Sequence, residues 1–430
     1  MMPPATIETD FRADAGVPAP WLGRLVAWTN SPAYLALADL LIVLAAAALP
    51  WSTTLPAIFV ALWLPVVAPT IQWRELARQL AQPAFAFPLL LLALAIMGML
   101  WSEAPWAARL RGVTPAAKFW VIPFLLHQFR RSQRGVLVLI AFAISCSLLM
   151  ILSWIVMFDP ALKITRTVSD GVPVKNYIDQ SQEFALCAFA LAQPALTLLR
   201  SGRWLAAIGC LALITAFMAN LLFVVSARTA LLYMAVLLLL FASLHLSRRG
   251  MLALFAAVAV AAALVWSTSP YLRQRIADIA VEYRSYENNT LASTAQRLNY
   301  WNKSIRFFAE APILGHGTGS IRQLFERDAA GQTGLRGEVV NNPHNQTLNV
   351  AVQWGFLGVI LLYAMWLSHL RLFVGSGLAA WIGLVVVTQN VVSSLLNSHL
   401  FDFHEGWIYV LGVGVAGGMR LRQLRTLEQS

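Results

Sequence analysis

The best candidate for chemistry is His344, near the end of the one long polar stretch (268–349) in an otherwise apolar chain. Asn342 and Pro343 precede it, and a hydrophobic segment follows. Asn is a favoured helix N-cap and Pro a favoured first helical residue, so this pattern places His344 in a helix's first turn. The helix macrodipole disfavours imidazolium there, and a neutral imidazole is a competent general base. The alternative is a histidine that merely sits in a first turn.

Two arginines are the best candidates for binding an anion. Arg228 stands between two apolar blocks, in a connection too short to be a real loop. Arginine in lipid is costly unless it faces a wet cavity or a partner, and guanidinium pairs with phosphate in a bidentate way. Arg297 lies beside an apolar helical stripe, and together the two would suit a diphosphate, supported by Lys163, Arg166 and Lys175. The alternatives are a snorkelling arginine and a solvated helix face.

The segment 397–405 gathers further polar side chains. It contains Asn397, His399, Asp402, His404 and Glu405. Such a cluster can bind a metal or orient a base, but no spacing matches a known zinc motif, so the sequence predicts no metal. Asp402 can position His344 or a substrate hydroxyl, while most of the others are better interpreted as a polar cap on a short loop.

The glycines at 315, 317 and 319 resemble a phosphate-binding loop only superficially. They follow a predicted helix rather than a strand, and the lysine of a P-loop is missing. The sequence therefore argues against nucleotide binding, and it predicts no cofactor.

Composition indicates that lipid surrounds much of the chain. Of its 430 residues, 59% are hydrophobic and only 12% are charged, against about 25% in soluble domains. The net charge of +11 is explained by basic residues collecting on the cytoplasmic side of a membrane, so nucleic acid is not a predicted partner. Three cysteines lie inside apolar blocks, which argues against a disulfide framework. The first thirty residues show no cleaved signal peptide.

The apolar blocks predict an all-α polytopic membrane protein with about twelve transmembrane helices. Residues 1–32 form a cytoplasmic N-terminus with a short interfacial helix near 21–29, and residues 421–430 form a basic cytoplasmic tail. Spans one to nine occupy 33–267, and spans ten to twelve occupy 350–420. The predicted spans are 33–50, 54–70, 84–101, 115–129, 136–158, 182–199, 204–225, 229–246, 251–267, 350–368, 375–396 and 406–420.

Loop charges predict the orientation. Arginines collect after the even-numbered spans, which places those connections and both termini in the cytoplasm and the segment 268–349 outside. Helical spacing predicts helices in that segment at 271–286, from Ser293 onward, and at 321–328. The second has an apolar stripe of Leu298, Trp301, Ile305 and Phe308, and it ends at Pro312. The segment is thus predicted to be a helical lid that supplies Arg297 and His344.

Three landmarks, in order, resemble the O-antigen ligase and polymerase superfamily of bacterial inner-membrane proteins. The first is Ser-Ala-Arg-Thr-Ala-Leu-Leu at 226–232. The second is Gln-Arg at 296–297 through Trp301, followed by Pro-Ile-Leu-Gly-His-Gly at 312–317. The third is Pro-His-Asn at 343–345, leading into Trp-Gly-Phe-Leu-Gly at 354–358. They cover about residues 220–360, and the twelve-span layout extends the resemblance over the chain.

The resemblance implies a metal-independent, lipid-sugar-dependent (GT-C-like) glycosyltransferase. In the ligases, a polysaccharide linked to undecaprenyl diphosphate is moved to a sugar of the lipid A core on the periplasmic face. Arg228 and Arg297 match the family arginines taken to bind the diphosphate, and His344 matches the family histidine taken to be catalytic. Asp402 matches less closely, because spacing in its loop is poorly constrained.

Three alternatives remain open at the level of the sequence. An O-antigen polymerase uses the same donor with a growing glycan as acceptor. Protein O-oligosaccharyltransferases also resemble the chain but are usually longer at the C-terminus. A transporter of lipid-linked glycan would place charges at mid-membrane, whereas the predicted spans carry few charges, Asp39 being one exception.

Overall fold

The computed structural model describes residues 27–429, except 30, 226, 275 and 279–292. This part of the chain folds into helices and contains no strand. Much of the predicted interfacial helix near 21–29 and of the predicted helix at 271–286 lies outside the described residues. The first half comprises α2 (Pro32–Ala48), α3 (Thr54–Val67), α4 (Trp73–Gln79), α5 (Pro83–Met97), α6 (Trp106–Ala117), α7 (Val121–Arg131), α8 (Gly135–Phe158), α9 (Tyr177–Arg200) and α10 (Trp204–Phe223).

The second half has two long helices before the polar segment and three after it. It comprises α11 (Arg228–His245), α12 (Arg248–Thr268), α14 (Ser293–Glu310), α15 (Ile321–Ala329), α16 (Gln346–Leu372), α17 (Leu378–Ser394) and α18 (Phe403–Gln429). Short 3-10 turns join some of these elements, at 68–70, 118–120, 160–162 and 334–337.

Each of the twelve predicted spans coincides with helix. Six described helices are long and apolar enough to cross a membrane, or seven if α3 and α4, which bend by 108° at their junction, form one crossing. Three shorter apolar helices, α2, α5 and α17, coincide with further predicted spans. The chain is therefore a multi-pass membrane protein, while the number of twelve crossings and the domain boundaries stay predictions.

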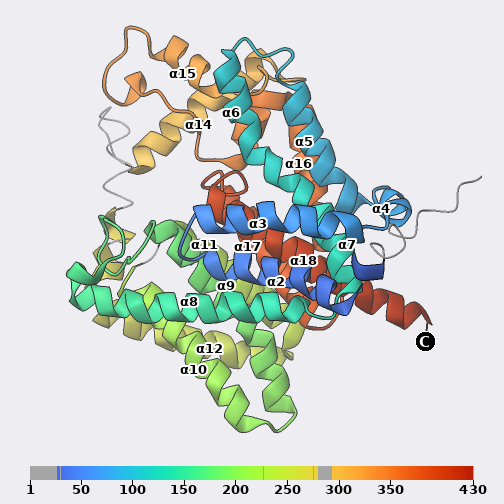
Figure 1. Cartoon of the computed structure of the whole chain (residues 1–430). Coiled ribbons are helices and arrows are strands. Elements are labelled where there is room, and N and C mark those ends of the chain that lie inside the picture. Colours follow the sequence, from blue (N-terminus) through green and yellow to red (C-terminus); the bar gives the residue numbers. More distant parts are fainter. Residues whose placement is uncertain (1–26, 30, 226, 275, 279–292, 430) are drawn as a thin grey trace, which may run out of the picture.

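The core lies where α9, α16, α17 and α18 meet α7 and α5 (Figure 1). Trp354, Trp366 and Trp381 are completely or almost completely buried there. In contrast, α10 and α12 expose Leu205, Leu252 and other apolar side chains at the periphery. A polypeptide in water would not leave such faces open, so lipid is their natural neighbour.

Asp39 is a charged residue inside the first predicted span, and its carboxylate accepts several hydrogen bonds in the structure. Its carboxylate accepts from the Gln128 amide at 2.8 Å and from the Ser132 hydroxyl at 2.7 Å. Arg134 lies 3.7 Å away. A buried carboxylate with this many donors can stay in the fold, because they compensate much of the desolvation cost of its charge.

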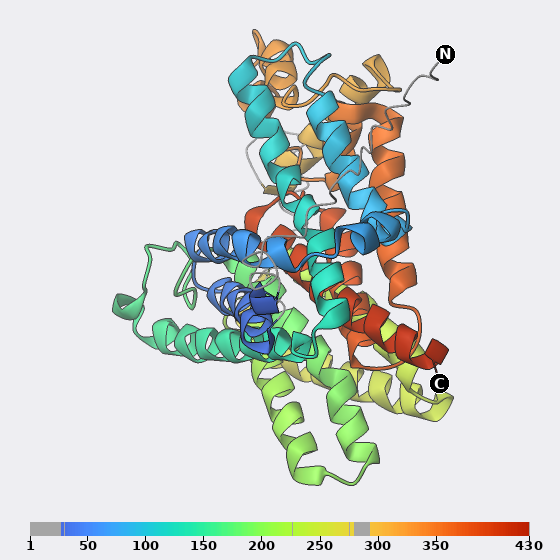
Figure 2. The same ribbon diagram turned by 45° about the vertical axis from the view of Figure 1, so that its right-hand side comes forward.

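Helices α14 and α15 gather at one end of the molecule, beside the turn that joins α5 to α6 (Figures 1 and 2). The predicted helices that start at Ser293 and Ile321 are confirmed. Of the apolar stripe predicted on the first of them, Leu298, Trp301 and Phe308 are half-buried, but Ile305 is 53% exposed. The face turned inward instead carries Tyr300 and Phe307, whose rings pack against Phe325 of α15.

Helix α16 is broken at Gly355. This residue has φ 61° and ψ −157°, inside an otherwise helical run. A Cβ atom there would lie 2.3 Å from the carbonyl oxygen of Ile313. Only glycine fits such a backbone conformation at such a close approach, so this position holds the segment after α14 against α16.

Candidate functional site

The backbone around His344 differs from the predicted one. Helix α16 begins at Gln346, and its N-cap is Asn345, whose side-chain oxygen accepts from the Leu348 amide at 3.0 Å. The prediction that Asn342 caps the helix and that His344 lies in its first turn is therefore wrong, because an equally good cap stands three residues later. His344 precedes the helix with φ 53°, in the left-handed region that few non-glycine residues adopt.

Side chains from two other segments hold His344 in that conformation. The Asn342 side-chain oxygen accepts from the His344 amide at 2.9 Å and from the Ser398 hydroxyl at 2.7 Å. The indole N–H of Trp301 donates to the His344 carbonyl at 3.3 Å. A strained backbone persists only when its surroundings over-determine it, and this one is fixed from α14 and from the 395–402 loop.

Hydrogen bonding defines the tautomer of the His344 ring. The ring atom Nδ1 lies 2.7 Å from Asn397 Oδ1. That same Asn397 atom accepts from the backbone N–H of Ser398 at 3.0 Å. A backbone N–H only donates, so this Asn397 atom is an acceptor and His344 Nδ1 must carry the proton. The lone pair of a neutral ring is therefore on Nε2.

The surroundings of His344 favour the neutral ring. Burial lowers the pKa of His344 below its ordinary value, and the positive charge of Arg297 lowers it further, while the hydrogen bond to Asn397 opposes both. Tyr300 stacks on the imidazole with ring centroids 6.0 Å apart, and its hydroxyl donates to Glu338 at 2.8 Å. A neutral ring of this kind can accept a proton at neutral pH, and the main cause of its lowered pKa is burial rather than the predicted helix dipole.

The two predicted arginines share one small cavity. Arg228 is the first residue of α11, and Arg297 lies in the second turn of α14. The cavity has a volume of about 110 Å³, and its walls also include the start of α9 and the 395–402 loop. Its lining residues are Tyr177, Ile178, Ala227, Arg228, Thr229, Ser293, Arg297, Asn397 and His399.

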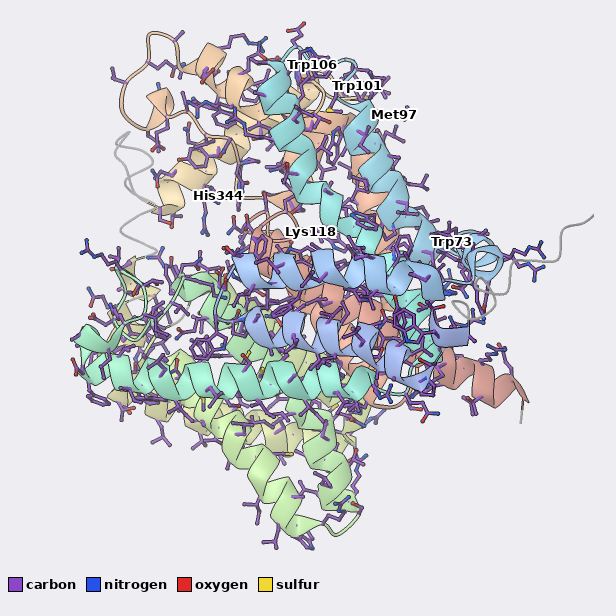
Figure 3. All side chains as sticks on the ribbon, viewed as in Figure 1. Trp73, Met97, Trp101, Trp106, Lys118 and His344 are labelled. Carbon is purple, nitrogen blue, oxygen red and sulfur yellow. The ribbon has the colours of Figure 1, made fainter. Side chains whose placement is uncertain are left out.

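Contacts join this cavity to the histidine and to neighbouring carboxylates. Asn397 lines the cavity together with both arginines, and it also accepts the hydrogen bond of the His344 ring, so it links the cavity to the histidine. Arg228 lies 3.8 Å from a carboxylate oxygen of Asp278 and 3.5 Å from the Thr294 hydroxyl. Figure 3 shows His344 near α14 and far from the tryptophans at the α5–α6 turn.

The other predicted site residues do not line this cavity. Lys163 donates to two backbone carbonyls of its own loop, and Arg166 is exposed. Lys175 pairs with Glu183 at 2.9 Å. Burial raises the pKa of Asp402 to about 6, and the Asp402 carbonyl accepts from Lys118 at 2.5 Å. Asn397, rather than Asp402, accepts the hydrogen bond of the His344 ring.

Sequence reasoning missed a buried polar layer behind the cavity. His404 and Asp179 lie 2.8 Å apart, and both are nearly completely buried. Asp179 begins a run of five buried polar residues, 179–183, at the start of the otherwise apolar α9. This run of polar residues at the end of a span could have revealed the layer in the sequence, since polar groups in membrane segments mark functional regions. Among the described residues, no three His, Cys, Asp or Glu side chains group as metal ligands.

Comparison with protein families assigns the segment that carries these residues. Residues 212–363 match the family model described as O-antigen ligase. The chain contains an O-antigen ligase family domain. The matched segment runs from α10 into α16, and it includes Arg228, Arg297 and His344, whereas Asn397 and Asp402 lie beyond it. Comparison with curated proteins gave no significant match.

This domain confirms the family resemblance that the three sequence landmarks predicted. The family supports a ligase- or polymerase-type activity of a glycosyltransferase-like enzyme. A lipid-linked glycan and membrane lipid are the partners that suit such a domain within a multi-pass helical protein.

Proposed function

We propose that the protein is an O-antigen ligase of the bacterial inner membrane, active in lipopolysaccharide biosynthesis. It moves a polysaccharide from undecaprenyl diphosphate to a sugar hydroxyl of the lipid A core, on the periplasmic face. The observation that carries this proposal is the cavity that joins Arg228 and Arg297 to Asn397, the residue that holds the His344 ring. The family domain over the same residues supports it.

The geometry supports a direct displacement. The acceptor hydroxyl gives its proton to Nε2 of His344 while its oxygen attacks the anomeric carbon. The bond from that carbon to the diphosphate oxygen breaks, and the electron pair stays on the diphosphate. Arg228 and Arg297 stabilise the charge that develops there, so neither a general acid nor a metal is required. One displacement inverts the anomeric centre.

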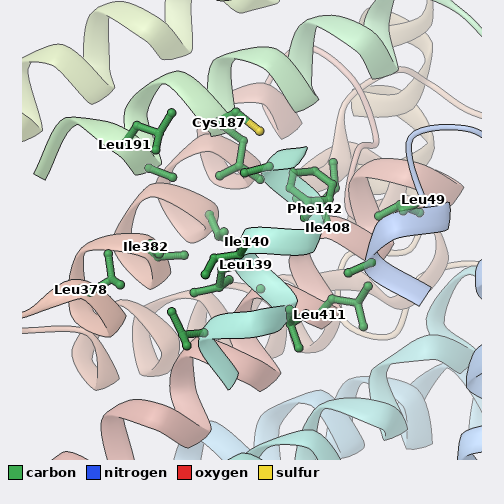
Figure 4. Close-up of a pocket in the computed structure, with 18 of the residues that line it drawn as sticks. Leu49, Leu139, Ile140, Phe142, Cys187, Leu191, Leu378, Ile382, Ile408 and Leu411 are labelled. Atoms are coloured by element: carbon green, nitrogen blue, oxygen red, sulfur yellow. The ribbon is translucent and has the colours of Figure 1, made fainter. Parts of the chain in front are cut away.

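An apolar cavity deeper in the helices supports a lipid donor. It has a volume of about 180 Å³ and is lined by apolar side chains of α2, α8, α9, α17 and α18, among them Leu139, Phe142, Leu191 and Ile408 (Figure 4). Helix α9 contributes Ile178 to the arginine cavity and Leu186 to this one. Eight residues of helix correspond to roughly 12 Å, so one helix joins a headgroup cavity to a cavity for part of a hydrocarbon chain.

A reconstituted reaction tests the proposal. Purified protein is supplied with undecaprenyl-diphosphate-linked glycan and with lipid A core, in the presence and absence of a chelator. We expect a core-linked product whose yield the chelator does not change. Longer lipid-linked glycan formed without core would identify a polymerase instead, and glycan joined to protein would identify an O-oligosaccharyltransferase. Translocation of the donor without any new bond would identify a transporter.

A further inference from the structure

The glycine-rich turn at 315–319 is a clamp between three parts of the fold. His316 and Gly317 donate backbone hydrogen bonds to α16, at the carbonyls of Val352 and Gln353, and Thr318 donates to Gly98 at the end of α5. Gly317 has φ 84°, and a Cβ there would lie 2.5 Å from Ser102 Cα. The turn therefore fixes α14 and α15 against the α5–α6 turn without contacting the arginine cavity.

A second polar cavity, of about 710 Å³, lies beside this clamp. Its lining comes from both sides of the clamp, with Trp101 and Glu103 on the α5–α6 turn and Glu310, His316, Gln323 and Arg327 on the other side. Trp101 lies at the end of the molecule remote from His344 (Figure 3). The indole N–H of Trp101 donates to the Leu314 carbonyl at 3.2 Å, so the ring is held in place.

These side chains have the chemistry that recognises a sugar ring. The face of an indole packs against the apolar C–H face of a pyranose. Planar carboxylate, amide and guanidinium groups then exchange hydrogen bonds with neighbouring hydroxyls and fix the orientation of the ring. Arg327 is held at 2.8 Å from Glu310, so part of this polar lining is already ordered before a ligand arrives.

The charge of the lining selects among sugars. Glu103, Glu310 and Glu326 line the cavity. Arg327 pairs with Glu310 and Arg322 pairs with Glu326, so the excess negative charge of the described lining is that of Glu103. Carboxylates in excess repel phosphate and carboxylate groups, so the cavity suits neutral sugars or sugars with an amino group. The same repulsion disfavours an anionic lipid headgroup.

Helix α14 joins this cavity to the arginine cavity. Ser293, its first residue, lines the arginine cavity, and Glu310, its last, lines the second one. At about 1.5 Å per residue these ends lie roughly 26 Å apart. We propose that the second cavity binds a neutral segment of the glycan several sugars away from the reacting end, an inference that rests on the proposed function.

Binding of free glycan tests this subsite separately from transfer. The probe is the host's own surface glycan, released from its lipid by mild acid and titrated calorimetrically into the purified full-length protein. We expect Trp101→Ala to weaken binding by about tenfold or more. Trp106→Ala is the matched control, because Trp106 stands on the same hairpin, is 61% exposed and does not line the cavity. Its affinity should equal that of the wild type.

A second variant guards against misfolding of the first. Glu103 is exposed, so Glu103→Gln should leave the melting temperature unchanged and still weaken glycan binding. In transfer assays, Trp101→Ala should raise KM for a long-glycan donor but not for a donor with a single sugar, which is too short to reach. Absence of binding by the wild type, or equal affinity in Trp101→Ala and Trp106→Ala, would overturn the subsite. If the wild-type protein binds the free glycan but transfers none from the lipid-linked donor, only the proposed function is overturned.

Discussion

At the residue scale, the main feature is a histidine whose two ring nitrogens have different tasks. Nδ1 donates to Asn397, and in the proposed reaction the lone pair on Nε2 accepts the proton of the acceptor hydroxyl. An amide acceptor differs from the carboxylate that orients many catalytic histidines, because it fixes the ring without stabilising imidazolium by charge. The sequence placed Asn397 within a polar loop, but only the fold shows it beside His344.

The pH dependence of transfer follows from the environment of His344. Burial lowers its pKa from the ordinary 6.5, and only the neutral ring accepts a proton. Transfer is therefore expected to be constant around neutral pH and to fall as the pH drops through a midpoint below about 6.5. The measurement is kcat/KM between about pH 5 and pH 8.

Asn397→Asp tests whether His344 controls this dependence of kcat/KM on pH. A carboxylate beside Nδ1 stabilises imidazolium, which should raise the pKa of His344 and move the acid limb upward by about one unit or more. An unmoved limb in this variant would show that another group controls the pH dependence.

Arg297 is predicted to act through both its shape and its charge. Arg297→Lys keeps the charge but loses bidentate binding, so we expect kcat/KM to fall roughly ten- to hundredfold with the acid limb unchanged. Arg297→Gln also removes a positive charge that lowers the pKa of His344, so its acid limb should move to higher pH. Equal profiles in the two variants would contradict electrostatic coupling between Arg297 and His344.

At the scale of elements, hydrophobic blocks predicted the helices well. The length and apolar content of a membrane helix are set by the thickness of the bilayer rather than by tertiary contacts, so both can be recognised in the sequence. Helix starts and buried faces were harder. Two asparagines three residues apart compete to cap α16, and only the fold shows that Asn345 succeeds. Likewise, Tyr300 and Phe307 are buried because α15 and α16 cover that side of α14, which periodicity within one helix cannot reveal.

The break in α16 gives a stability prediction. Gly355→Ala introduces a Cβ 2.3 Å from the Ile313 carbonyl, at φ 61°. We expect a loss of at least about 1–3 kcal/mol, seen as a lower melting temperature in detergent. The control is Gly209→Ala in α10, where a Cβ meets nothing within 4 Å; removing a helical glycine should stabilise by roughly 0.5–1 kcal/mol. Equal melting temperatures would contradict the strained position.

At the scale of the whole molecule, α14 and α15 lie at the top of Figure 2, and the C-terminal end of α18 lies in its lower half. Charge bias predicts that these two regions lie on opposite sides of the membrane, because arginines accumulate on the cytoplasmic side. The sequence could not predict that Arg228, Arg297 and Asn397 converge, since these residues come from two helices and a loop that are far apart in the chain.

Two glycines provide a matched test of orientation. Gly202 and Gly331 have φ values of 73° and 74°, and neither has atoms within 4 Å of a Cβ position. We expect a membrane-impermeant maleimide to label Gly331→Cys in intact spheroplasts. Gly202→Cys should react only after the membrane is permeabilised. A variant without Cys146, Cys187 and Cys210 serves as the background, and the reverse pattern would invert the topology.

The central claim is that the neutral His344 ring removes the proton of the acceptor hydroxyl. The most direct measurement is single-turnover transfer by His344→Ala and by wild type, with donor binding measured in parallel. We expect the variant to bind donor lipid normally, because Arg228 and Arg297 are intact, while transfer slows by about 10²–10⁴-fold. Transfer at the wild-type rate in His344→Ala would contradict the assignment of this residue as the base.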